Sequence, residues 1–249
     1  MGIGKLEIKN LCKSFDGSQV LTNVCFQAAA GEFVAVMGQS GCGKSTLLYC
    51  VSGMDRPTSG EVRFDGRELS TLTDREMEKL RLAHMGFIFQ KANFLKNLSI
   101  ADNIVFPAFQ LGRQSRSEIV REAERLMERL NILAVADYDI RRVSGGQLQR
   151  AAICRAMINH PDILFGDEPT GALNSSATRE VLDIIGQINR DGTSVLLVTH
   201  DAKVAARADR VIYLEDGQIK DILQLGKYRE TERSGREQNM QEWLGRMEF

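Results

Sequence analysis

The segment Gly38-Gln39-Ser40-Gly41-Cys42-Gly43-Lys44-Ser45 has the form G-x-x-x-x-G-K-[ST] and is followed by Thr46. The apolar run Phe33–Met37 precedes it and has the length of a buried strand. Glycines let the backbone curl so that consecutive N–H groups point at phosphate oxygens, and the following helix adds the positive end of its dipole. This order of strand, loop and helix predicts a phosphate-binding loop in an α/β fold.

Three side chains of this loop have predicted roles. Lys44 is expected to reach the outer phosphates of a nucleotide, and the Ser45 hydroxyl to hold a magnesium ion. Cys42 lies near the start of a helix, where the thiolate is favoured. A maleimide reagent is therefore expected to block the activity of the protein, and bound nucleotide to protect it.

Length and composition limit the possible classes. The 249 residues, 43% of them hydrophobic, can form one large α/β domain or two small ones with a sizeable core. Lys and Arg total 32 and Asp and Glu total 33, so no overall basic field favours nucleic acid, and we expect no nucleic-acid partner. The cysteines form no C-x-x-C pair, which is typical of reduced thiols; they are Cys12, Cys25, Cys42, Cys50 and Cys154.

The sequence has no stretch that is typical of membrane insertion. Apolar residues nowhere run for 18 positions, and Met1–Lys5 lacks the apolar core of a signal peptide. The expectation is a cytoplasmic protein that reaches a membrane only through a partner.

Around the phosphate loop, the pattern indicates strands at both ends of the chain and helices between them. Leu6–Leu11 and Val20–Phe26 alternate like antiparallel strands joined by the turn Asp16-Gly17. The sequence pattern changes near residue 70, and capping boxes at Thr73–Glu76 and Ser115–Glu118 indicate the starts of two helices. We therefore expect a core lobe at about residues 1–90 and 161–225, with a helical lobe inserted at about 91–160.

Polar residues follow several predicted core strands. Gln90 ends one apolar run, Asp167 and Glu168 end another, and His200 ends a third. Open α/β sheets bind ligands at the carboxyl ends of their strands. Asp167 is expected to hold magnesium, and Glu168 to orient or deprotonate the attacking water. Taken alone, Gln90 and His200 fit ordinary polar positions better than functional ones, and the spacing of Phe15 favours a core aromatic.

A second anion-binding helix start is predicted at Val143-Ser144-Gly145-Gly146-Gln147, which precedes a helical run ending before Pro161. Together with the phosphate loop and the strand-end residues, this pentapeptide resembles the ATP-binding subunit of an ABC transporter over residues 5–225. The resemblance implies a phosphate-loop NTPase core with an N-terminal antiparallel β-subdomain and an inserted helical lobe. The whole would form one ABC ATPase domain at residues 1–225.

The same resemblance implies a dimer, most simply a homodimer, with ATP and Mg²⁺ as ligands and an integral membrane permease on a separate chain. Each ATP would lie between the phosphate loop of one subunit and Ser144–Gln147 of the other. Gln90 would contact magnesium and the attacking water, and His200 would contact the γ-phosphate. Phe15 would stack on adenine. The metal ligands implied are Ser45, Gln90 and Asp167, and the catalytic residues implied are Lys44, Glu168 and His200. The residues implied to bind ATP are Phe15, Gly38, Gln39, Ser40, Gly41, Cys42, Gly43, Lys44, Ser45, Thr46, Gln90, Ser144, Gly145, Gly146 and Gln147.

Three positions depart from the family pattern. Phe15 stands where tyrosine is usual, Val143 where leucine is usual, and Asn174 where an aspartate usually ends the loop after Glu168. The segments Gly86–Gln90 and Asn103–Pro107 are similar to the subgroup that serves lipoprotein release, macrolide export and antimicrobial-peptide resistance. The tail and Asn174 resemble the bacitracin-resistance type within it.

This resemblance implies a motor subunit, peripheral on the inner face of the cell membrane, for exporting or removing an antimicrobial peptide or a lipid-linked substrate. Two alternatives stay open. One is an ATP-gated signalling subunit of a membrane complex that transports nothing, and the other is a soluble ABC-type ATPase.

The tail, residues 226–249, begins with a charge-rich run and then places Met240, Trp243, Leu244 and Met247 at helical spacing. This pattern favours a short amphipathic helix that packs on its own domain. The alternative is a helix that contacts the dimer mate or the membrane subunit.

Overall fold

The computed structural model describes residues 5–247 and divides into two compact units. The first unit comprises Met1–Met77 and Asn189–Phe249, and the second comprises Glu78–Ile188. The second unit is larger than the lobe expected at 91–160. It also contains a strand and most of a helix before residue 91, and a strand and a helix after residue 160. The outermost ends of the predicted domain and tail, residues 1–4 and 248–249, lie outside the described residues.

An antiparallel sheet opens the first unit, in the strand order β2-β1-β4-β5. Its strands are β1 (Leu6–Phe15), β2 (Ser18–Ala28), β4 (Ser59–Phe64) and β5 (Arg67–Glu68). The turn between β1 and β2 has positive φ at Asp16 (47°) and Gly17 (82°), as a type I′ hairpin requires. Both predicted strands are present, and both are longer than the alternating segments alone indicated.

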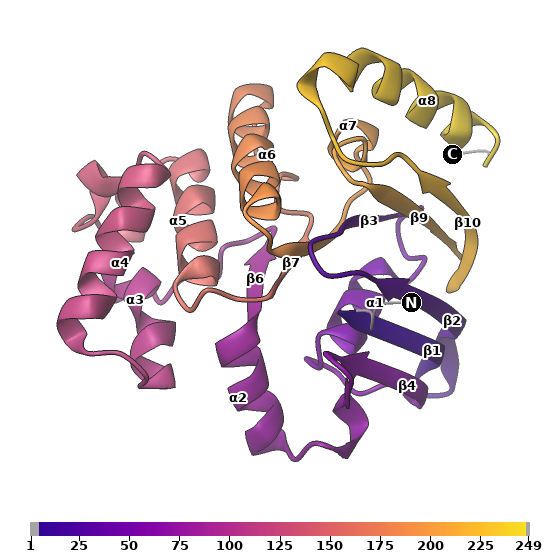
Figure 1. Cartoon of the computed structure of the whole chain (residues 1–249), viewed down its shortest axis with the longest axis horizontal. Helices are drawn as coiled ribbons and strands as arrows, with labels where there is room; N and C mark the ends of the chain where they lie inside the picture. The colour runs from indigo at the N-terminus through magenta and orange to yellow at the C-terminus, as the bar shows by residue number, and fades with distance from the viewer. Residues whose placement is uncertain (1–4, 248–249) are drawn as a thin grey trace. The chain divides into compact units, whose positions relative to one another are not determined.

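Parallel strands form the other sheet region of the first unit. β3 (Phe33–Met37) is buried at all five residues, and it lies between β8 (Ser194–Val198) and β9 (Arg210–Glu215), parallel to both. β9 returns as the antiparallel strand β10 (Gln218–Gln224) (Figure 1). Two helices follow strands of this region directly, α1 (Lys44–Val51) after β3 and the short α7 (Ala202–Ala205) after β8.

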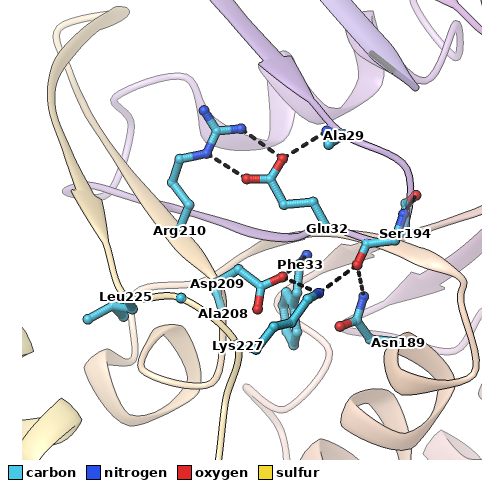
Figure 2. Close-up of polar contacts among 12 residues, drawn as sticks. Ala29, Glu32, Phe33, Asn189, Ser194, Ala208, Asp209, Arg210, Leu225 and Lys227 are labelled. Atoms are coloured by element: carbon cyan, nitrogen blue, oxygen red, sulfur yellow. Dashed lines mark hydrogen bonds and ion pairs between the residues drawn. The ribbon is translucent and has the colours of Figure 1, made fainter. Parts of the chain in front are cut away.

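Ion pairs at the start of β3 tie this sheet region to the beginning of the tail (Figure 2). Asp209, 9% exposed, accepts hydrogen bonds from the Phe33 backbone N–H at 2.9 Å and from the Lys227 ammonium at 2.6 Å. Beside it, Arg210 binds both carboxylate oxygens of Glu32 at 2.8 and 3.0 Å. The strand that leads into the phosphate loop is therefore anchored at its first residue.

The second unit combines two parallel strands with helices. β6 (Met85–Phe89) pairs with β7 (Ile163–Asp167). Its helices, labelled in Figure 1, are α3 (Ile100–Leu111), α4 (Arg116–Arg129), α5 (Gly145–Met157) and α6 (Ser175–Arg190). A further helix, α2 (Asp74–His84), begins in the first unit and ends in the second. The predicted capping boxes are present, at Thr73 with Glu76 before α2 and at Ser115 with Glu118 before α4.

Tail residues form α8 (Arg233–Gly245), which packs on the first unit near α7 and β10 (Figure 1). Met240, Trp243 and Leu244 are at most 6% exposed. The Trp243 indole donates to Asp221 at 2.8 Å, and its ring meets Tyr213 edge to face. Arg236 donates to the backbone carbonyls of Ala206, Ala208, Leu225 and Gly226.

Helices in the described range, residues 5–247, are all too short or too polar to cross a membrane.

Candidate functional site

The phosphate loop follows β3 and needs its glycines. φ is positive at Gly38 (153°), Gly41 (83°) and Gly43 (100°). A Cβ on Gly38 would lie 2.1 Å from the Leu214 carbonyl oxygen, so no side chain fits there. Lys44, 9% exposed, extends over the loop and donates to the carbonyls of Gly38 at 2.8 Å and Gln39 at 2.7 Å. The ammonium group therefore lies inside the curve of the backbone, where phosphate oxygens would meet it.

A pocket of about 440 Å³ lies beside this loop, within the size range of ligand sites. The turn between β9 and β10 forms part of its wall, and the Gly217 N–H donates to the Cys42 carbonyl at 3.2 Å. The lining residues come from the start of β2, the phosphate loop and this turn: Ser18, Gln19, Val20, Gln39, Ser40, Gly41, Cys42, Glu215, Asp216 and Gly217.

Cys42 differs from the sequence expectation of a favoured thiolate. Burial raises the pKa of its thiol above the ordinary value, and the nearby Lys44 charge, which lowers the pKa, does not compensate. Its position near the start of α1 is as expected, but the desolvation cost outweighs the helix end and the lysine.

Phe15 and His200 belong to the same unit as the phosphate loop. Phe15 is the last residue of β1, and 47% of its surface is exposed. The prediction of a core aromatic, which its spacing favoured, is therefore wrong. His200 follows β8, and the adjacent Thr199 N–H donates to the Val36 carbonyl of β3 at 3.1 Å. His200 therefore leaves the sheet at the edge where β3 enters the phosphate loop.

In the second unit, the sheet register brings the other strand-end residues together. Phe89 at the end of β6 pairs with Asp167 at the end of β7, so Gln90 and Glu168 emerge side by side. Gly171 makes room for the amide, because a Cβ there would lie 2.8 Å from Gln90 Nε2. Glu168 has a positive φ of 49°, a conformation that turns the chain sharply after the strand.

The predicted second anion-binding helix start is the N-terminus of α5. The Ser144 hydroxyl accepts from the Gln147 N–H at 3.2 Å, and the Gln147 amide oxygen accepts from the Ser144 N–H at 2.8 Å. Ser144 and Gly145 are exposed. Beside them is a pocket of about 360 Å³, which is lined by Ser144, Gly145, Gly146, Arg150, Ala172, Leu173, Asn174, Ser176, Ala177 and Glu180.

Asn174 caps α6 in this region, since its amide oxygen accepts from the Ala177 N–H at 2.9 Å. An aspartate, usual here in the family, would accept the same bond. The change to asparagine therefore keeps the cap and removes one negative charge from the exposed loop.

Sequence reasoning missed two side chains of α5 that hold the loop after Gln90. Gln149, 4% exposed, donates to the Phe89 carbonyl at 3.2 Å. Arg155 donates to the carbonyls of Ala92 and Asn93 and lies over the Phe94 ring, 4.4 Å from its centroid. Burial lowers the pKa of Arg155 to about 10. Only packing places these residues on the loop, and their spacing along α5 gives no sign of it.

The donor chemistry fits ATP and magnesium. Within residues 5–247, no group of three or more His, Cys, Asp or Glu side chains is suited to a metal ion. Magnesium, however, is usually held by one or two carboxylates together with substrate phosphates and water. Ser45 of the first unit offers a hydroxyl, and Gln90 and Asp167 of the second offer an amide oxygen and a carboxylate, which are donor types of this kind.

Two known proteins that are similar to this chain are both described as export ATP-binding/permease proteins. A Mannheimia succiniciproducens protein described as "Macrolide export ATP-binding/permease protein MacB" is 40% identical over 88% of this chain. A Pseudomonas syringae protein described as "Probable syringafactin export ATP-binding/permease protein SyfD" is 41% identical over 86% of this chain. The chain spans about a third of the length of these curated relatives, 34% and 33%.

A solved structure, that of the ATP-binding cassette MJ0796 as a post-hydrolysis dimer bound to ADP and Pi, shares the fold. It superposes with a TM-score of 0.83 at 35% identity, covering 90% of this chain and 100% of that one. The family model described as "ABC transporter" matches residues 21–171. The phosphate loop, the strand-end acids and the helix start at Ser144 are thus parts of one known architecture, and the chain belongs to the ABC transporter family as an ATP-binding cassette.

Proposed function

We propose that this chain is the ATP-hydrolysing motor of an exporter and works with a membrane permease on a separate chain. The observation that carries the proposal is a phosphate loop with an inward lysine on one unit and an exposed, capped signature helix on the other. Relatives whose names join "export", "ATP-binding" and "permease" support it. Such a motor would lie on the inner face of the cell membrane.

We assign ATP to the phosphate loop, with its phosphates on the Gly38–Thr46 backbone and on Lys44. Phe15 is assigned to the adenine base and His200 to the γ-phosphate. The family pattern assigns Ser45, Gln90 and Asp167 to one magnesium ion. This ion, when bound, neutralises charge on the β- and γ-phosphates.

Each ATP is assigned to two copies of the chain. The chain has one phosphate loop and one signature sequence, and Ser144 and Gly145 are exposed rather than covered by their own unit. The N-terminus of α5 suits a phosphate anion, because the helix dipole and the first-turn N–H groups both favour negative charge. The dimeric MJ0796 cassette supports a homodimer that closes on two ATP molecules through Ser144–Gln147.

Hydrolysis then needs an oriented water and an acceptor for its proton. The water attacks the γ-phosphorus, the bond from phosphorus to the ADP oxygen breaks, and the Glu168 carboxylate accepts the proton from the water. Phosphoryl transfer of this kind depends mainly on positioning and charge stabilisation. Glu168 directly follows the end of β7, and its positive φ of 49° turns the chain at that point.

Glu168→Gln tests this assignment. The amide keeps the size of the side chain and cannot accept the proton, so we expect ATP hydrolysis to fall about 100- to 10,000-fold. ATP binding should persist, and the ATP-bound protein should accumulate as a dimer in size-exclusion chromatography with light scattering. Asp183→Asn, an exposed acid on α6, serves as the control. Near-normal hydrolysis by Glu168→Gln would refute the role of Glu168.

For the substrate we propose an antimicrobial peptide or a lipid-linked molecule, in line with the subgroup that the motifs resemble. The decisive measurement is ATP-driven transport by the chain and its permease in reconstituted vesicles. Substrate-stimulated hydrolysis without transport would instead support an ATP-gated signalling subunit. Hydrolysis that responds to DNA or ribosomes, with no copurifying membrane protein, would support a soluble ATPase.

A further inference from the structure

Phe15, which the proposed function places against the adenine base, has a cation on one of its faces. The Lys13 ammonium lies 4.6 Å from the centroid of the Phe15 ring. Both side chains come from the last three residues of β1. The Lys13 side chain is 10% exposed, whereas Phe15 is 47% exposed. One face of the ring is thus covered by the lysine while the residue as a whole stays open to solvent.

Lys13 is fixed in this position by three contacts of its ammonium group. It lies 2.8 Å from each carboxylate oxygen of Asp55 and 2.8 Å from the Arg56 carbonyl oxygen. An ammonium group has three N–H donors, so these contacts use its full capacity. The cation cannot swing toward solvent without losing these contacts, which keeps it behind the ring.

The partner segment of Lys13 is itself attached to the phosphate-loop helix. The backbone N–H groups of Met54 and Asp55 donate to the Tyr49 carbonyl in the last turn of α1, at 2.9 and 3.1 Å. Thr58 then binds β1 on either side of Lys13, donating to the Cys12 carbonyl at 2.8 Å and accepting from the Ser14 N–H at 3.0 Å. The strand that ends in Phe15 is therefore held in register with the helix that starts at the phosphate loop.

We propose that Lys13 is a positioning residue for recognition of the nucleotide base, an inference that rests on the proposed function. Its charge is attracted to the electron-rich face of the phenyl ring and fixes the ring orientation. By drawing electron density to that face, it makes the opposite face a better surface for an electron-rich purine. Lys13 does not touch the nucleotide, and Asp55 and Arg56 hold it in place.

The same antiparallel sheet region offers a matched control. Lys5, just before β1, lies 5.1 Å from the centroid of the Phe64 ring of β4 and pairs with Asp65 at 3.5 Å. Phe64 is only 2% exposed, so no base can stack on it. Lys5→Met removes a cation–ring contact of the same kind without affecting a surface that is open to a ligand.

The test compares the affinities of the full-length protein for MgATP and for magnesium tripolyphosphate, which has the phosphates without the base. Lys13→Met should weaken ATP binding by up to about fivefold, the upper limit set by the whole free energy of an exposed cation–ring contact, and leave tripolyphosphate binding unchanged. Lys13→Arg, which keeps the charge and the carboxylate pairing, should restore most of the ATP affinity. Lys5→Met should change neither affinity.

A second variant separates base recognition from folding. The double variant Lys13→Met with Asp55→Asn leaves no unpaired carboxylate. It should show the same loss of ATP affinity as Lys13→Met and an unchanged affinity for tripolyphosphate. Equal weakening of both ligands, or no weakening of ATP, would overturn the role of Lys13. If Phe15→Ala weakens ATP binding and Lys13→Met does not, this inference fails and the proposed function stands. Failure of the wild-type protein to bind either ligand would overturn the proposed function itself.

Discussion

The pKa of the Cys42 thiol is affected in opposite directions by its neighbours in the phosphate loop and by burial. Its sulfur lies 4.0 Å from the Lys44 ammonium, which favours the thiolate, yet burial has the larger effect and raises the pKa of the thiol. Asp216, in the turn beside the loop, raises the pKa further. Cys42 is therefore mainly protonated at neutral pH, and only its thiolate reacts with electrophiles.

From this environment we predict that maleimide inactivation of the ATPase accelerates with pH. A raised pKa means that the thiolate fraction grows about tenfold per pH unit until the pH reaches that pKa. The inactivation rate measured between pH 6.5 and 8.5 should rise throughout. Prior ATP should protect, because the nucleotide covers the loop and adds negative charge beside the sulfur.

Cys42→Ser is the control for this prediction. The serine variant should resist inactivation. Cys50 and Cys154 are buried, and burial raises their pKa values to about 11 and about 12. Cys12 and the exposed Cys25 can react, but neither lines the pocket beside the phosphate loop. Unchanged inactivation of Cys42→Ser would show that another thiol is modified. A rate that is already constant at pH 6.5 would indicate a thiolate at neutral pH.

At the scale of elements, the loop between β6 and α3 is held in one conformation by buried polar side chains. Asn103 of α3, 1% exposed, accepts from the Leu95 N–H at 2.8 Å and donates to the carbonyls of Leu95, Leu98 and Ser99. Next to this loop, α3 carries Phe106 and Phe109 with 42% and 45% of their surfaces exposed. Leu95 is 48% exposed. Exposed apolar side chains on a preorganised surface are typical of a docking site.

If the proposed permease partner docks here, Phe106→Asp combined with Phe109→Asp should weaken its binding about tenfold or more. Burying a charge without a partner in an apolar interface is costly, whereas both side chains are exposed in the isolated cassette. Basal ATP hydrolysis and thermal stability should stay close to wild type. Affinity is measured with the detergent-solubilised permease.

The control for the docking prediction is Val120→Asp on α4, whose side chain is also exposed, at 39%. This variant should bind the permease normally. Equal loss of binding in both proteins would point to a general effect of added negative charge, and unchanged binding of the double variant would refute the docking surface.

At the scale of the whole molecule, the tail is part of the folded first unit. Arg236, 6% exposed, binds four carbonyls around the end of α7 and the end of β10, so its charge is satisfied by backbone dipoles. Trp243 and Met240 bury apolar surface against the same unit. Lys227 fastens the start of the tail to Asp209 and to the Gly31 carbonyl. The structure thus favours packing on the chain's own unit, the first of the two possibilities for this tail.

We predict that deleting residues after Tyr228 lowers the melting temperature by about 10 °C, because loss of one buried tryptophan alone costs ~3–5 kcal/mol. Trp243 is the sole tryptophan of the 249 residues, so its fluorescence in the full chain reports the docking of α8. Its emission should shift to the red in the same thermal transition as the circular dichroism signal. Stability unchanged by the deletion, with loss of complex assembly, would show that the tail serves a partner instead.

Local sequence pattern was enough to predict several features of the fold. The apolar run before Gly38 is a buried strand, the capping boxes at Thr73 and Ser115 start helices, and Asp16-Gly17 is a tight turn. These features depend on neighbours a few residues away, so the chain itself encodes them. The extent of the second unit was not predictable in this way, because β6 and β7 pair across more than seventy residues of intervening chain.

What the sequence by itself determined was the chemistry of the cassette: a phosphate loop, strand-end acids and a signature helix start, each defined by residues adjacent in the chain. Tertiary structure alone decided the environments of those groups. Burial reversed the expected pKa shift of Cys42, exposure made Phe15 available, and the ion pair of Lys13 with Asp55 placed a cation behind that ring. Desolvation and long-range contacts depend on which distant residues pack together, and no spacing within a short segment encodes them.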